Sequence, residues 1–110
     1  MIKINNAKLV DNSLVDIEID NGVITKLGKA AGGKSKDGID ASGKMLLPGL
    51  VDLHTHLREP GREDAETVLT GSVAAVAGGY TSISAMANTN PVADTAGVVE
   101  QIYRLGKSAG

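Results

Sequence analysis

Two histidines stand one residue apart in LLPGLVDLHTHLREPG (residues 46–61), and the 110-residue chain has no others. Side chains at alternate positions of a β-strand point to the same face, so His54, His56 and Arg58 would project together. Two neutral imidazoles on one face can bind one metal ion, and imidazole suits zinc. We therefore interpret His54 and His56 as metal ligands rather than as polar residues at a strand end. Asp52 shares their face, and we expect it to hold a histidine rather than to bind the metal itself.

Arg58 and Asn88 are candidate substrate-binding residues. Arg58 lies at the strand end where α/β folds place their ligand sites, and its planar fork matches a carboxylate. Asn88 follows the next predicted strand, in AMANTNP, where an amide can donate to a carboxylate or a ring oxygen. Both have a plainer interpretation, in which Arg58 pairs with Glu59 or Glu63 and Asn88 is ordinary turn chemistry. The residues alone leave these roles open.

A period-two pattern predicts β-structure in the first third of the chain. In LVDIEID (residues 14–20) apolar and acidic residues alternate, as in a strand with one buried face. Asn21–Gly22 separates it from VITKL (residues 23–27), and this pair favours a tight hairpin turn because both positions need positive φ. With MIKI at the N-terminus, these runs predict a small antiparallel sheet. The residues 28–38, rich in glycine and lysine, predict an exposed loop.

Three more strands are expected in the rest of the chain. The apolar run around Pro48–Gly49 is divided by the proline, which cannot donate to a sheet ladder. A short strand should therefore end near Leu47, and a new one should run from Leu50 to Leu57. YTSISAMA (residues 80–87) predicts a further strand.

Helical spacing of apolar residues separates and follows these strands. The first helix is expected to begin near Asp64, as N-cap, and to stop at Gly78–Gly79. The second follows a cap at Asp94 or Thr95. The order strand, helix, strand, helix is typical of a parallel sheet with right-handed crossovers, so the fold class is α/β.

The composition argues against several classes of function. The chain is 42% hydrophobic and 22% charged, which is typical of a soluble globular protein. The net charge is −2, with lysines and arginines scattered, so neither nucleic acid nor a membrane is an expected partner. There is no cysteine, and the N-terminus lacks a secretory signal pattern, so a cytoplasmic location is expected.

The chemistry-bearing residues also resemble a known family. PGLVDLHTHLREPG (residues 48–61) is similar to the metal-binding signature of the amidohydrolase superfamily. HLREPG followed about thirty residues later by NTNP (residues 88–91) resembles the dihydroorotases specifically. The resemblance covers nearly everything from Pro48 to the end of the chain.

This resemblance implies a fold in two parts. Residues 48–110 would be the first two βα units of an incomplete (β/α)8 TIM-type barrel, the metal-dependent hydrolase domain. Residues 1–47 would be the N-terminal strands of a small β-sandwich domain.

The resemblance also implies an activity, the reversible conversion of N-carbamoyl-L-aspartate to (S)-dihydroorotate in de novo pyrimidine (UMP) biosynthesis. Zinc would be the cofactor, with His54 and His56 as ligands, and Arg58 and Asn88 would hold the substrate carboxylate. The general acid/base and the other metal ligands would lie beyond residue 110. The 110 residues alone are therefore expected to be inactive.

Two other functions stay open. One is an allantoinase- or hydantoinase-like cyclic amidase, because the HxH motif is common to the superfamily. The other is a non-catalytic dihydroorotase-like subunit that scaffolds aspartate transcarbamoylase, although such a role leaves no need for His54 and His56. Besides the small-molecule substrate, the expected partners are a second copy of the protein or aspartate transcarbamoylase.

Overall fold

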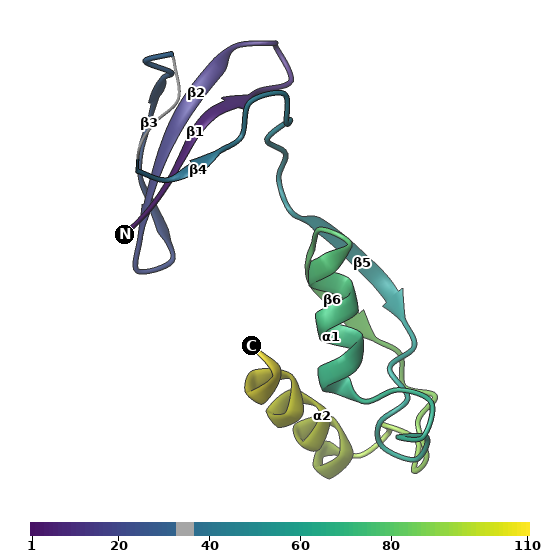
Figure 1. Cartoon of the computed structure of the whole chain (residues 1–110). Coiled ribbons are helices and arrows are strands. Elements are labelled where there is room, and N and C mark those ends of the chain that lie inside the picture. The colour runs from purple at the N-terminus through teal and green to yellow at the C-terminus, as the bar shows by residue number, and fades with distance from the viewer. Residues whose placement is uncertain (33–36) are drawn as a thin grey trace. The chain divides into compact units, whose positions relative to one another are not determined.

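The computed structural model of the chain describes residues 1–32 and 37–110 and is a mixed α/β structure (Figure 1). The chain separates into two compact units, Met1–Pro48 and Gly49–Gly110. Neither helix of the described residues has the length and apolar character that crossing a bilayer requires.

The first unit is a four-stranded sheet with the order β3-β2-β1-β4. Its strands are β1 (Ile2–Lys8), β2 (Leu14–Asp20), β3 (Val23–Lys29) and β4 (Ile39–Asp40). β1, β2 and β3 pair antiparallel, which confirms the small antiparallel sheet. The short β4, which pairs parallel to β1, was not expected from the sequence.

The turn between β2 and β3 has the predicted geometry. Asn21 and Gly22 have φ values of 48° and 77°, so both central residues lie in the left-handed region that a tight hairpin requires. The predicted loop at residues 28–38 begins later than expected, because β3 continues to Lys29. Residues 33–36 of that loop lie outside the described residues.

The core of the first unit follows from the alternation along β2, where Val15 and Ile17 are buried. The buried apolar residues and those packed against them are Ala7, Val15, Ile17, Ala41, Ile4, Leu9, Ile19 and Leu46. Asp16 points the other way, and its carboxylate accepts hydrogen bonds from the backbone N–H groups of Asn6, at 2.9 Å, and Ala31, at 3.1 Å. Asn6 has φ of 61° and lies where the β1–β2 register shifts, so Asp16 satisfies a backbone donor at an irregularity of β1.

The second unit pairs β5 (Leu50–Thr55) in parallel with β6 (Tyr80–Ala85). Helix α1 (Val68–Ala77) connects them and packs against β6, and α2 (Ala96–Ala109) packs against α1 (Figure 1). The predicted order of strand, helix, strand, helix and the parallel pairing are confirmed.

Three element boundaries differ from the sequence expectation. The short strand expected to end near Leu47 is absent. In its place Met45 forms a single isolated bridge with Lys8. The next strand, β5, ends at Thr55 rather than Leu57, so His56 lies just past it. The predicted strand 80–87 likewise ends early, at Ala85.

Helix α1 begins later than predicted. Asp64 does not cap it and instead binds the Arg62 guanidinium at 3.2 Å, in solvent. Thr67 is the N-cap instead, and its hydroxyl accepts from the Thr70 N–H while the Thr70 hydroxyl accepts from the Thr67 N–H.

The other helix signals are confirmed. Gly78 ends α1 as its C-cap, and Gly79 follows with φ of 86°. Of the two cap candidates for α2, Thr95 is the one used, since its hydroxyl accepts from the Val98 N–H.

Helix α1 can approach the loop after β5 only because residue 71 is glycine. A Cβ atom added to Gly71 would lie 2.5 Å from Cδ2 of Leu57, which is buried. This contact fixes the distance between the helix and the segment that follows His56.

We predict that Gly71→Ala lowers the free energy of unfolding by about 1–3 kcal/mol, because the added methyl overpacks the contact with Leu57. Gly106→Ala in α2 is the matched control, since an added Cβ there meets nothing within 4 Å. It should stabilise by roughly 0.5–1 kcal/mol through helix propensity. Urea denaturation of both variants measures the difference, and equal effects would contradict the packing argument.

We predict that Asp16 makes the first unit sensitive to acid. Hydrogen bonds from the Asn6 and Ala31 N–H groups hold the pKa of Asp16 below its ordinary value of 3.8. A lowered folded-state pKa contributes stability that is present above pH 3.8 and is lost as the pH falls through the folded pKa. Asp16→Asn should remove this part of the pH dependence in unfolding curves recorded from pH 6 downward; an unchanged acid profile would contradict the assignment.

Candidate metal centre

The two histidines of the chain face each other at the end of β5. The Nε2 atoms of His54 and His56 are 3.1 Å apart, and the ring centroids are 4.9 Å apart with an interplanar angle of 64°. His54 lies in the strand and His56 just past it, so the alternation of side chains still brings both rings to one side. Both residues are exposed, so their paired nitrogens are accessible.

This nitrogen pair fits a zinc ion. Two imidazole nitrogens at about 2.0–2.1 Å from one zinc ion, at a tetrahedral angle, would be about 3.3 Å apart. The observed 3.1 Å requires little movement of either ring. Among the described residues no group of three or more His, Cys, Asp or Glu side chains forms a complete site. His54 and His56 are therefore two candidate ligands of a zinc ion.

Asn88, which follows β6, contacts one of these histidines. Its Oδ1 lies 2.9 Å from Nδ1 of His56. A carbonyl oxygen can only accept, so Nδ1 of His56 carries a proton, and in the neutral imidazole Nε2 then keeps its lone pair. The sequence placed Asn88 at the same end of the sheet as Arg58, and the contact with His56 was not predicted. The available signal was the parallel pairing of two consecutive strands, whose carboxyl ends must meet.

Asp52 holds the backbone of His54 rather than its ring. Its Oδ1 accepts a hydrogen bond from the His54 N–H at 2.9 Å, a local contact between residues i and i+2. The sequence expectation that Asp52 supports a histidine thus corresponds, in the structure, to a contact that fixes the strand end and not the imidazole.

Arg58 pairs with neither of the carboxylates considered from the sequence. The Glu59 carboxylate accepts from the Val68 N–H at 2.8 Å, at the start of α1, and the Glu63 carboxylate accepts from the Gly61 N–H at 2.9 Å. Both acids therefore hold backbone groups of their own loop. Arg58 makes no hydrogen bond or ion pair within residues 1–32 and 37–110, and its guanidinium remains available to a ligand.

The loops that carry Arg58 and Asn88 are tied to each other. The Asn90 N–H donates to the Pro60 carbonyl at 3.0 Å, and the Met86 N–H donates to the Thr55 carbonyl at 2.9 Å. Thr89 is buried, and its hydroxyl donates to the Pro91 carbonyl at 2.8 Å. These bonds hold the residues on either side of Asn88 in place.

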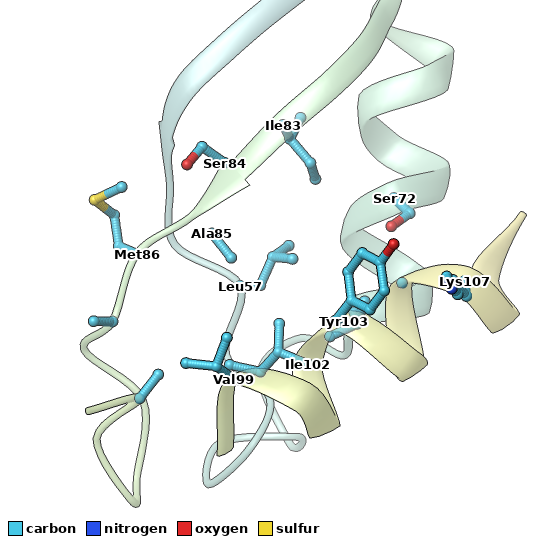
Figure 2. A pocket seen from close by; sticks show the side chains of 14 residues that line it. Leu57, Ser72, Ile83, Ser84, Ala85, Met86, Val99, Ile102, Tyr103 and Lys107 are labelled. Atoms are coloured by element: carbon cyan, nitrogen blue, oxygen red, sulfur yellow. The ribbon is translucent and has the colours of Figure 1, made fainter. Parts of the chain in front are cut away.

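A separate cavity of about 600 Å³ lies among β6, α1 and α2. Figure 2 shows Ile83 directed toward the helices and Ser84 and Met86 directed away from them, as strand alternation requires. The lining is Leu57, Val68, Ser72, Ile83, Ser84, Ala85, Met86, Ala87, Ala93, Val99, Ile102, Tyr103, Gly106 and Lys107. Neither histidine, Arg58 nor Asn88 lines it, so the candidate metal centre is a different site.

Comparison with known proteins gives the same family along most of the chain. The chain is 58% identical over 107 residues to a dihydroorotase of Streptomyces coelicolor, covering 97% of this chain and 25% of the relative. It is 56% identical to a dihydroorotase of Leifsonia xyli, covering 97% and 24%, and 55% identical to one of Mycobacterium tuberculosis, covering 87% and 23%. The chain thus spans about a quarter of the length of these curated relatives.

A family model described as Dihydro-orotase-like matches residues 43–107, which is more than half of the chain. The matched region contains both histidines, Arg58 and Asn88. The chain belongs to the dihydroorotase-like family.

Proposed function

We propose that these 110 residues act as part of a longer zinc-dependent dihydroorotase, which interconverts N-carbamoyl-L-aspartate and (S)-dihydroorotate in pyrimidine biosynthesis. The observation that carries this proposal is the pair of imidazole nitrogens 3.1 Å apart at a strand end, in a chain of the dihydroorotase-like family. Paired nitrogens at that separation suit a shared zinc ion, and without a metal the same pair forms a hydrogen bond.

The proposed architecture is the beginning of a (β/α)8 barrel, preceded by strands of a small β-sandwich domain. Parallel sheets are normally covered on both faces and at both edges. In the second unit, Val51 and Leu53 of β5 are 59% and 76% exposed, so this strand needs further cover. Other large apolar residues exposed in this unit are Leu50, Leu69, Val73, Val76, Val92, Val99 and Tyr103. Additional strands and helices of a barrel would provide that cover.

The residues of this chain would bind and orient the substrate beside the metal. His54 and His56 would hold zinc through Nε2. When bound, zinc would lower the pKa of its water ligand to about 7 and polarise the carbonyl that is attacked. The Arg58 guanidinium would donate two hydrogen bonds to the substrate carboxylate, and the Asn88 amide would donate to the same group. The reaction also needs a group that moves a proton. We assign no such group within the 110 residues, so the isolated segment should be inactive.

Two rival functions make different demands on these residues. An allantoinase- or hydantoinase-like amidase acts on a ring without a carboxylate at this position, so Arg58 would have no substrate group to bind. In a scaffold subunit for aspartate transcarbamoylase, the histidines would have no metal to bind. The unpaired guanidinium and the paired imidazoles therefore favour dihydroorotase. A cytoplasmic location and association with a second copy or with aspartate transcarbamoylase stay predictions from the sequence.

We predict that Arg58→Met in the full-length protein raises KM for dihydroorotate about 10- to 150-fold, because a charge-assisted hydrogen-bonded pair contributes roughly 1.5–3 kcal/mol. Arg62→Met is the matched control, since Arg62 belongs to the same loop but pairs with Asp64 in solvent. Its KM should stay within about threefold of the parent, as expected for an exposed pair.

Each rival has an outcome that would establish it against this proposal. An unchanged KM in Arg58→Met, together with faster hydrolysis of hydantoin or allantoin than of dihydroorotate, would show a different cyclic amidase. A purified protein that contains no metal by elemental analysis and does not turn over dihydroorotate would show a scaffold.

A further inference from the structure

Asn88 bridges the two halves of the candidate site. It belongs to the loop after β6, whereas His56 belongs to the segment after β5, and the Oδ1–Nδ1 contact of 2.9 Å joins them across the parallel strand pair.

The two ends of the Asn88 amide have different partners. Oδ1 accepts from His56, whereas Nδ2 makes no hydrogen bond with any residue that the structure describes. A neutral imidazole carries one N–H, and the bond to Oδ1 places it on Nδ1. The lone pair on Nε2 of His56 then accepts the hydrogen bond from Nε2–H of His54 at 3.1 Å.

His56 is the only one of the two imidazoles held in this way by the described residues. Asp52 binds the backbone N–H of His54, and Nδ1 of the His54 ring has no partner within residues 1–32 and 37–110. The ring of His56 is thus oriented before a metal arrives, whereas the His54 ring depends on its contact with His56. Removing the Asn88 acceptor should therefore act on the metal through His56.

We propose that Asn88 is a positioning residue for the metal as well as a donor to the substrate. Its Oδ1 fixes His56 as the Nδ1–H tautomer with Nε2 ready to bind zinc, and its Nδ2 is left for the substrate carboxylate. Because one rigid amide does both, the orientation of the metal ligand and that of the substrate donor are linked. Both roles rest on the proposed zinc centre, and the second rests also on the proposed substrate.

Two substitutions in the full-length protein separate these roles. Asn88→Ala removes acceptor and donor, so zinc affinity should fall roughly 10- to 100-fold, the usual loss when the partner of a metal-binding histidine is removed. KM for dihydroorotate should rise as well. Asn88→Asp keeps an acceptor for His56 but sets a negative charge against the substrate carboxylate. It should retain zinc affinity within about threefold of the parent while KM rises at least as much as in Asn88→Ala.

The measurements are zinc affinity by competition with a chelator, steady-state kinetics, and 15N NMR of the histidine rings in the metal-free protein. The His56 signal is assigned by its loss in His56→Gln and should show the Nδ1–H tautomer in the parent and in Asn88→Asp. Asn90→Ala is the matched control: it is an asparagine of the same loop whose side chain has no partner among the described residues. It should leave zinc affinity and the His56 tautomer unchanged.

Three results would overturn the proposal: an Nε2–H tautomer of His56 in the parent, zinc affinity in Asn88→Ala equal to the parent, or an equal loss of zinc affinity in Asn88→Ala and Asn88→Asp. The last would mean that Asn88 only shapes its loop. If Asn88→Ala does not fold by circular dichroism, the parent tautomer and the Asp variant decide the question. A protein with the expected tautomers and zinc affinities that does not turn over dihydroorotate would refute the proposed function and leave the role of Oδ1 intact.

Discussion

Thr55 and Ala85 form the last pair of the parallel ladder between β5 and β6, and the Met86 N–H continues it by donating to the Thr55 carbonyl. Parallel pairing makes the two strands end at the same edge, so the residues that follow them become neighbours although 32 positions separate His56 from Asn88. In an antiparallel pair the segment after one strand would lie beside the start of the other. The candidate site depends on this one constraint.

The loop from Arg58 to Glu66 shows how a short stretch can leave one charge available. Glu59 and Glu63 each accept from a backbone N–H, and Glu59 reaches the first turn of α1, where N–H groups lack helical partners. Because both carboxylates are committed to the backbone, neither neutralises Arg58. A carboxylate in such a loop is therefore no proof that a neighbouring arginine is paired, and the sequence alone could not decide between these arrangements.

Local signals predicted most of the fold. The alternation around Ile17 and the Asn21–Gly22 turn are set by neighbouring residues, and both are as expected. The start of α1 was wrong because two residue types suited a cap: Asp64 is one, but Thr67 forms the reciprocal capping box with Thr70. β4 pairs parallel with a strand more than thirty residues earlier, and two residues carry too little pattern to reveal it.

In the candidate site, too, the contact set by local spacing was predicted and the contact set by strand register was not. Strand alternation was enough to bring His54 and His56 together, because the spacing of two residues is local. The bond between His56 and Asn88 depends on the register of two strands and on the turn after β6, which no single stretch specifies. The sequence could therefore place Asn88 at the same end of the sheet as Arg58 but could not identify which atom it would touch.

We propose that His54 and His56 bind one zinc ion through their Nε2 atoms. Anomalous diffraction at the zinc absorption edge, from crystals of the full-length protein, locates such an ion. An anomalous peak is expected at about 2.0–2.1 Å from both Nε2 atoms. No peak between the two rings, or a peak bound by only one of them or through Nδ1 of His56, would contradict it.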